Sequence, residues 1–266
     1  MTSRSTLVPL VALLLLPAVA LALLAAGVGS DVVPEAEPPV GKPMLPDLAA
    51  EPPRNLETRL VNGRWNIAFT TIILNVGAGD FLLRASREGD GWRVEQGIAY
   101  TEGGAKVVPV KAPLVWGGDG HNHWHVEKVA SVRLGSTKSR TLPEDESHPR
   151  ADSKAGFCFY DHTHELKRGP KKGVYSAYGC GMSDSQFVGM GLSPGWNDTY
   201  GSSLPGQTID VSALEDGTYR MWFLVDENGW FRESSEANNA SWIDFKLFTK
   251  GDQRYALGLA TGPKPS

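Results

Sequence analysis

Three histidines at alternate positions are the part of the sequence best suited to chemistry. The stretch 117–126 reads G-G-D-G-H-N-H-W-H-V and contains His121, His123 and His125. In a β-strand alternate side chains leave the same face, so an extended segment presents these imidazoles side by side. Neutral imidazole binds zinc, copper, nickel or iron, and three histidines with an open fourth position are typical of a catalytic metal site. The alternative is a surface strand that carries histidine, although half of the chain's 6 histidines lie here.

The charge and the N-terminus restrict the class of protein. The chain of 266 residues has a formal net charge of −4 and no basic stripe, so nucleic acid is not an expected partner. An apolar run from Leu7 to Val28 follows Arg4, and segment 1–30 is therefore either a secretory signal peptide or an N-terminal membrane anchor. Both alternatives place the rest of the chain outside the cytoplasm.

The two cysteines, Cys158 and Cys180, fit an oxidising compartment. A bridge between them would stabilise the fold by roughly 3 kcal/mol on the chain-entropy account. Outside the cell we expect this disulfide rather than two free buried thiols.

Residues 31–46 are rich in proline and are expected to form an extended linker. The next segment, 47–250, is the expected folded domain, and 251–266 is the expected C-terminal tail. Strand patterns flank Asn62-Gly63, a strong hairpin signal, and recur at 81–84, 92–94, 98–100, 129–134, 155–160, 218–225 and 242–248. Most of 179–206 is rich in glycine and serine and reads as irregular. These patterns predict an all-β fold, a β-sandwich core with long irregular loops that carry the site.

Five motifs occur in an order that resembles the catalytic domain of the lysyl oxidase family, over about residues 46–248. They are I-A-F-T-T-I-I-L-N-V-G-A-G-D-F-L-L at 67–83, the H-x-H-x-H segment, K-A-G-F-C at 154–158, G-W-N-D-T-Y at 195–200 and D-V-S-A-L-E-D-G-T-Y with E-S-S-E-A-N-N within 210–239. The third is similar to the family's K-A-S-F-C, and the fourth to its G-C-W-D-M-Y.

The resemblance implies copper bound by the three histidines and a lysine tyrosylquinone formed from Lys154 and Tyr200. Enzymes of this family oxidise primary amines to aldehydes with O₂ and release ammonia and hydrogen peroxide. Asp161 stands at the family's acidic position and is the implied general base. Taken without the resemblance, Lys154 reads as a solvated loop lysine and Tyr200 as a packed tyrosine.

Some positions depart from the animal enzymes, which carry additional cysteines around the cofactor tyrosine. Gly195 replaces the cysteine directly before the tryptophan, so packing of Trp196 is expected to hold the Tyr200 loop instead. His162 and His164 have no counterpart in the family; we interpret them as loop histidines, with extra metal ligation as the alternative.

The resemblance also implies a second metal. Some lysyl oxidase-like enzymes bind calcium between a Pro-Asp-Leu segment and an Asn-Asn turn. One acidic ligand of the family is Ser235 here, and Glu236 is the candidate substitute. The alternative is an ordinary polar hairpin turn. The matching ligands in this chain are Asp47, the Leu48 carbonyl, Glu233, Asn238 and Asn239.

The expected function is an exported copper-dependent amine oxidase that acts with O₂ on peptidyl lysine or small primary amines. The alternative is a secreted, non-enzymatic β-sandwich module for metal binding or adhesion, which keeps the histidines without forming the quinone. A metal hydrolase is a third class, but no H-E-x-x-H signature occurs. Whether Lys154 and Tyr200 are joined discriminates the first two.

Overall fold

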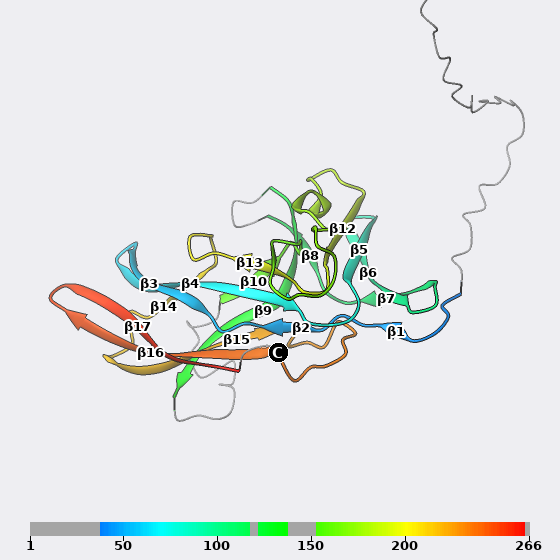
Figure 1. Ribbon diagram of the computed structural model, residues 1–266. Coiled ribbons are helices and arrows are strands. Elements are labelled where there is room, and N and C mark those ends of the chain that lie inside the picture. The colour runs from blue at the N-terminus through cyan, green and yellow to red at the C-terminus, as the bar shows by residue number, and fades with distance from the viewer. Residues whose placement is uncertain (1–37, 118–121, 138–152, 264–266) are drawn as a thin grey trace, which may run out of the picture. The chain divides into compact units, whose positions relative to one another are not determined.

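The computed structural model describes residues 38–117, 122–137 and 153–263 (Figure 1). Among these residues, all regular elements are β-strands except one 3-10 helix, η1 (Ala177–Cys180). The prediction of an all-β fold is confirmed. No helix in the described part of the chain is long and apolar enough to cross a membrane. The predicted signal or anchor, 1–30, lies outside the described residues.

One sheet is built on β4 (Arg64–Asn75), whose residues from Ile67 onward are all buried. This burial agrees with the apolar residues on both faces of the strand. The predicted hairpin to β3 (Arg54–Val61) is confirmed, and Asn62 and Gly63 take the positive φ angles, 51° and 74°, of a tight hairpin turn. The strand order is β11-β13-β4-β14, and β2 and β3 also pair with β4. The remaining strands are β2 (Leu48–Ala50), β11 (Thr163–His164), β13 (Trp196–Tyr200) and β14 (Thr208–Asp210).

A second sheet contains the histidine segment at the start of β9 (Trp124–Ser136). Its order is β10-β9-β15-β16-β17, and β8 also pairs with β9; all these pairs are antiparallel. Residues expected as a C-terminal tail form β17, which pairs with β16 along its whole length. The other strands are β8 (Leu114–Trp116), β10 (Ser153–Phe157), β15 (Gly217–Val225), β16 (Ala240–Lys250) and β17 (Gln253–Gly262).

The third sheet has the order β1-β6-β5-β12, with β7 also paired to β6. The two short strands expected at 92–94 and 98–100 form one strand, β6. The expectation that most of 179–206 is irregular is wrong where β12 and β13 form. The strands of this sheet are β1 (Pro43–Met44), β5 (Phe81–Glu88), β6 (Gly91–Tyr100), β7 (Ala105–Val110) and β12 (Phe187–Leu192).

A row of aromatic rings runs through the core. Phe231 packs edge to face on Phe81, with ring centroids 4.8 Å apart, and Phe81 packs on Phe159 at 4.7 Å. Phe159 stacks on Phe157, and Phe157 lies 4.2 Å from the ring of Tyr200. All five side chains are buried. The ring of Tyr200 is therefore positioned by the hydrophobic core as well as by its own strand.

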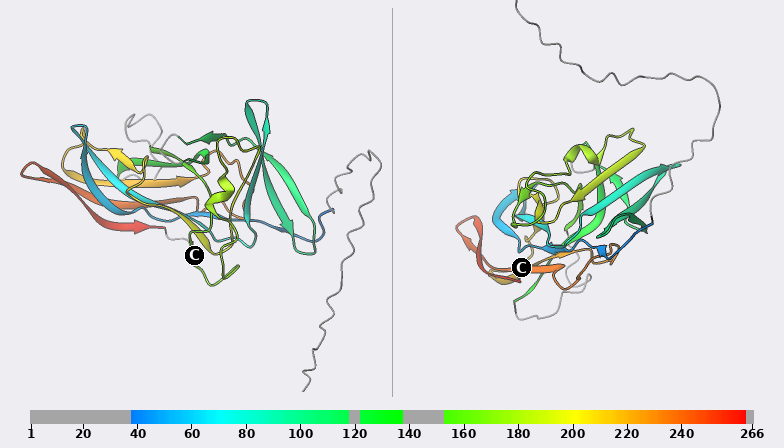
Figure 2. Two further views of the ribbon diagram at one scale, coloured as in Figure 1. Left: turned by 90° about the horizontal axis from the view of Figure 1, so that it is seen from above. Right: turned by 45° about the vertical axis from the view of Figure 1, so that its right-hand side comes forward.

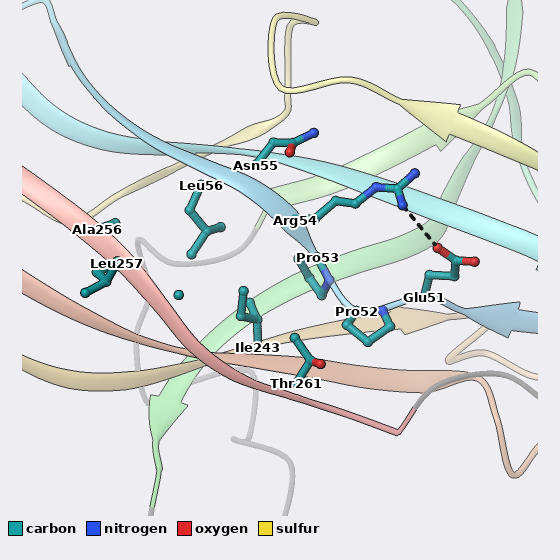
Figure 3. A pocket seen from close by; sticks show the side chains of 11 residues that line it. Glu51, Pro52, Pro53, Arg54, Asn55, Leu56, Ile243, Ala256, Leu257 and Thr261 are labelled. Carbon is teal, nitrogen blue, oxygen red and sulfur yellow. Dashed lines mark ion pairs between the residues drawn. The ribbon is translucent and has the colours of Figure 1, made fainter.

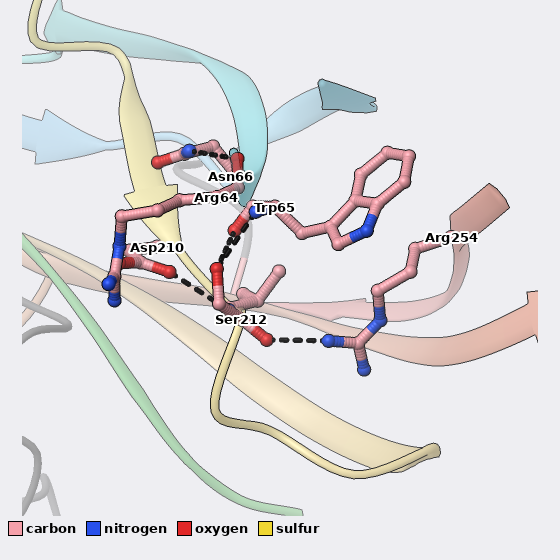
Figure 4. A network of polar contacts seen from close by, with 7 residues as sticks. Arg64, Trp65, Asn66, Asp210, Ser212 and Arg254 are labelled. Carbon is pink, nitrogen blue, oxygen red and sulfur yellow. Dashed lines mark hydrogen bonds and ion pairs between the residues drawn. The ribbon is translucent and has the colours of Figure 1, made fainter. Parts of the chain in front are cut away.

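The β3–β4 hairpin lies beside the β16–β17 hairpin in both views of Figure 2, and β17 contacts β3. Arg254 of β17 secures this junction. Its guanidinium donates to the carbonyls of Val211 and Leu214 at 2.7 Å each. In the adjoining network Arg64 pairs with Asp210 (Figure 4). These contacts fix the turn after β14 against both hairpins.

The side chain of Asn75 connects three backbone segments where β4 ends. Its Oδ1 accepts hydrogen bonds from the N–H groups of Asp47 and Gly77, at 3.1 and 3.0 Å. Its Nδ2 donates to the carbonyls of Gly79 and Leu192, at 2.9 and 2.8 Å. The side chain is fully buried. One amide thus holds the segment before β2, the turn into β5 and the end of β12.

Replacing Asn75 with alanine should lower the unfolding free energy on the order of 3 kcal/mol or more, because buried backbone groups lose their partners. Urea unfolding of the purified protein measures this change. Asn66→Ala is the matched control, since the Asn66 side chain donates a local hydrogen bond to the Arg64 carbonyl at a partly exposed site. Equal losses in the two variants would show that the Asn75 bonds are not a determinant of stability.

Candidate functional site

The described histidines of the H-x-H-x-H segment face each other. The Nε2 atoms of His123 and His125 are 3.0 Å apart, and their ring planes meet at 75°. His125 is buried at 1% exposure, whereas His123 is partly exposed. Two nitrogens that each bind one ion at about 2.0–2.1 Å must lie within roughly 4 Å of each other, so this pair fits a shared metal. His121 lies outside the described residues.

The lysine strand runs next to the histidine strand. Strand β10 pairs with β9, with Phe157 opposite Val126 and Lys154 opposite Ser131. Directly after β10, the Cys158 N–H donates a 3.0 Å hydrogen bond to the phenolic oxygen of Tyr200. The structure therefore brings Tyr200 to the end of β10 that lies nearest the histidines. Lys154 lies four residues earlier on the same strand.

The predicted disulfide is present and Trp196 is packed. Cys158 and Cys180 are bonded, with Cα atoms 5.8 Å apart, which ties the end of β10 to η1. Trp196 stacks on His164, with ring centroids 4.9 Å apart, and its indole N–H donates to the carbonyl of Pro170. This packing holds the start of β13, the strand that carries Tyr200. It lies next to Gly195, the position where the animal enzymes have a cysteine.

The carboxylate of Asp161 ties two loops together. It accepts hydrogen bonds from the N–H groups of Val174 at 2.7 Å and Tyr175 at 3.2 Å. It also accepts bonds from Ser193, from the backbone N–H at 2.7 Å and from the hydroxyl at 2.8 Å. These four contacts place Asp161 between the loop before η1 and the residue that follows β12.

A second aspartate, Asp198, was missed by the sequence analysis. It lies two residues before Tyr200 on β13, is completely buried, and neither carboxylate oxygen has a hydrogen-bond partner among the described residues. Burial raises its pKa well above the usual range. The charge of Asp161 adds to that rise, and the nearby Thr199 N–H opposes it without reaching hydrogen-bonding geometry. Strand alternation was the available signal, since positions 198 and 200 share a face.

A second polar cluster lies at the predicted calcium ligands. Carboxylate oxygens of Asp226, Glu233 and Glu236 lie within 4.8 Å of one another. The Leu48 N–H donates to Glu233, and the Asn238 amide donates to Asp47 at 2.6 Å. The structure thus brings the predicted Pro-Asp-Leu and Asn-Asn segments together. Asp226 was not predicted, although it follows directly after the apolar strand β15.

Two amide oxygens in this cluster lack donors. Oδ1 of Asn238 and Oδ1 of Asn239 are buried without hydrogen-bond partners in the described part of the chain. Burial, reinforced by the charge of Glu236, raises the pKa of Glu233 to about 8. Burial likewise raises the pKa of Asp226 to about 6. Crowded carboxylates and unpaired amide oxygens are the donor set that calcium prefers.

A groove of about 590 Å³ lies elsewhere, where the segment after β2 meets β17 (Figure 3). Its lining is mostly apolar, with Leu56, Ile243 and Leu257 among the contributing side chains. Glu51 and Arg54 form an ion pair at its rim, 3.9 Å apart. None of the predicted catalytic or metal residues lines this groove.

The fold and the site define an all-β protein with a histidine pair at the start of β9 and a buried tyrosine whose hydroxyl lies at the end of the neighbouring strand β10. The sequence pattern of the family described as lysyl oxidase matches residues 92–253. Curated proteins named protein-lysine 6-oxidase from Gallus gallus and Homo sapiens are 27% identical to this chain over 145 and 146 residues. Each match covers 54% of this chain and 30% of the relative's length. For the relative from Sus scrofa the match covers 50% of its length.

This chain belongs to the lysyl oxidase family. The predicted family membership is confirmed, and the matched residues include the histidine, lysine and tyrosine motifs. The chain spans between about a third and half of the length of these curated relatives.

The acidic cluster predicts a pH-dependent stability in protein freed of metal. Because the pKa of Glu233 is raised in the folded state, its contribution to stability is complete below 4.5 and is lost as the pH rises toward about 8. Glu233→Gln, a neutral isostere of the protonated acid, should therefore raise the unfolding free energy at pH 8 on the order of 3 kcal/mol. At pH 4.5 it should have little effect.

Urea unfolding in a chelator at both pH values measures this difference. Glu57→Gln, which weakens an exposed ion pair with Arg59 on β3, is the control and should change both values by less than about 1 kcal/mol. Equal effects of Glu233→Gln at the two pH values would rule out the raised pKa.

Proposed function

We propose that this chain is an exported copper-dependent amine oxidase that uses a lysine tyrosylquinone. Its substrates would be peptidyl lysine or small primary amines, converted to aldehydes with O₂ and with release of ammonia and hydrogen peroxide. Membership of the lysyl oxidase family supports the reaction class. The apolar run from Leu7 to Val28 supports a location outside the cytoplasm, whether it is cleaved or kept as an anchor.

The observation that carries the proposal is the convergence of three motifs far apart in sequence. Val126 of the histidine strand lies opposite Phe157 of the lysine strand, and the next residue, Cys158, binds the Tyr200 hydroxyl. If these motifs had unrelated roles, there would be no reason for them to lie side by side in the fold. Holding reacting groups close is a main way in which a protein accelerates chemistry.

Copper held by His121, His123 and His125 would supply the redox chemistry with oxygen. The protein's own part is orientation. The Cys158 N–H fixes the phenolic oxygen of Tyr200, and Phe157 packs against its ring at 4.2 Å. These contacts leave the ring only 5% exposed, which limits access of water to it.

Two aspartates compete for the role of general base. Asp161 is favoured by its position in the family resemblance, but its carboxylate already accepts four hydrogen bonds. Asp198 is favoured by its surroundings, since its carboxylate is buried, lacks hydrogen bonds from described groups and has a raised pKa. A raised pKa brings a carboxylate closer to the range useful for proton abstraction near neutral pH.

Calcium is the proposed second metal, bound by Asp47, the Leu48 carbonyl, Glu233, Asn238 and Asn239, with Asp226 and Glu236 as additional carboxylates. The unpaired amide oxygens of Asn238 and Asn239 support this assignment. Calcium would replace the proton on Glu233, so calcium added at pH 8 should stabilise the wild-type protein more than Glu233→Gln. Equal stabilisation of both proteins would argue against the site.

Peroxide release with a lysine-containing peptide tests the main proposal. Tyr200→Phe and Lys154→Arg should each reduce this activity to background, because either change removes half of the proposed cofactor. Tyr178→Phe, at a 96% exposed tyrosine, and Lys171→Arg, at an exposed lysine, are matched controls that should retain activity.

Mass spectrometry of copper-loaded protein provides the direct readout. The peptides that contain Lys154 and Tyr200 should be joined in the wild type and separate in both variants. Activity that survives both substitutions would contradict the quinone. Unmodified side chains after aerobic copper loading would favour the non-enzymatic metal-binding module.

The pH dependence of kcat/KM distinguishes the two aspartates. If Asp198 is the base, Asp198→Asn should lower kcat about 100-fold or more and remove the acid limb of the profile. Asp161→Asn should then mainly reduce stability in urea. A large loss of kcat in Asp161→Asn with the acid limb retained would assign the base to Asp161 instead.

A further inference from the structure

The geometry of the two described histidines indicates which ring nitrogens would face a bound metal. The Nε2 atoms of His123 and His125 approach to 3.0 Å. In imidazole, Nδ1 lies next to the carbon that carries Cβ, at the opposite end of the ring from Nε2. A metal bound at the Nε2 pair therefore leaves Nδ1 of His125 on the side of its own Cβ.

A carboxylate lies near the Cβ end of His125. Glu127 follows His125 at the next alternate position of β9. A Cβ atom added to Gly156 of β10 would lie 2.7 Å from Oε1 of Glu127 and 2.9 Å from Cβ of His125. The Glu127 carboxylate and the Cβ end of His125 are thus neighbours of the same point, above Gly156.

The local backbone makes room for this arrangement. Ala155 pairs with Ala130 and Phe157 with Val126, so three residues of β9 lie opposite Gly156 alone. Lys128, within this bulge, has a φ of 59°. Bulges of this kind redirect side chains next to functional sites.

At position 156, next to Glu127 and His125, this chain differs from the family motif. The family's K-A-S-F-C has serine where this chain has glycine. A serine Cβ would overlap the position of the Glu127 carboxylate oxygen. The position of the Glu127 carboxylate above residue 156 therefore depends on the glycine.

We propose that Glu127 is a positioning residue for the metal centre, whose carboxylate accepts a hydrogen bond from the Nδ1–H of His125. This role rests on the proposed function, because it requires a metal at the histidines. Such a bond fixes the tautomer and orientation of the imidazole and makes Nε2 a better donor to the metal. Glu127 does not contact the metal in this arrangement.

Copper affinity provides the first test, measured by titration against a chelator of known affinity. Glu127→Ala should weaken copper binding about 10- to 100-fold, the usual effect of losing such a partner. Glu127→Gln, which keeps an acceptor oxygen without the charge, should weaken it less. Gly156→Ser should weaken it as Glu127→Ala does, because the new side chain displaces the carboxylate. Glu57→Gln is the control and should bind copper as the wild type does.

The tautomer of His125 provides a readout that a purely structural role would not change. In zinc-loaded protein, which is diamagnetic, NMR should detect a slowly exchanging Nδ1–H on His125. That signal should be shifted in Glu127→Gln and lost in Glu127→Ala. A direct bond between Glu127 and the metal would instead leave the ring proton unaffected by these substitutions and would overturn the proposal.

The outcomes separate this inference from the proposed function. Copper binding and quinone formation in the wild type, with affinity and ring proton unchanged in Glu127→Gln, would overturn the role of Glu127 alone. Absence of metal binding to the wild type would overturn both. If Glu127→Ala fails to fold, the Glu127→Gln and Gly156→Ser measurements decide in the same way.

Discussion

The amide of Asn75 is the constraint on which the acidic cluster and the surroundings of Asp161 jointly depend. Its oxygen holds the N–H of Asp47, at the acidic cluster, and its nitrogen holds the carbonyl of Leu192. The next residue, Ser193, donates twice to Asp161 beside the tyrosine strand. A single buried side chain therefore sets the spacing between segments that are far apart in sequence. The hydrogen-bond partners of the Asn75 side chain are buried backbone groups. These segments therefore cannot shift without leaving a buried polar group unpaired.

Features with a local signal could be predicted from the sequence. The Asn62-Gly63 hairpin follows from two residues that adopt positive φ readily, and the strand character of β4 follows from apolar residues on both faces. The facing of His123 and His125 was expected from strand alternation, although β9 begins only at Trp124 and His123 lies just before it. In each case a few adjacent residues carry the whole physical cause. The Cys158–Cys180 disulfide needed only two cysteines and an oxidising compartment.

Features with a non-local cause could not be predicted. The segment that contains β12 looks irregular because of its glycines, yet Gly191 is required by packing. A Cβ there would lie 2.5 Å from the Phe81 carbonyl and 2.8 Å from the Tyr175 ring. Strand alternation places Asp198 on the face of Tyr200, but the importance of Asp198 and of Asp226 could not be predicted for a related reason. Their significance comes from burial and from neighbours that the sequence does not place beside them.

The row of aromatic rings transmits changes in core packing from one end of the row to the other. Phe231, whose N–H donates to Asp226, stands at one end, and Tyr200 stands at the other. Packed rings leave almost no free volume. One ring therefore cannot turn, or be replaced by a smaller side chain, without displacing the next ring. Phe81, the second ring of the row, is not among the proposed metal ligands, yet a smaller residue there would loosen the packing of Phe231 on one side and of Phe159 on the other. The position of the Tyr200 ring is thus set partly by the side chains packed behind it, so a packing defect elsewhere in the core also displaces this ring.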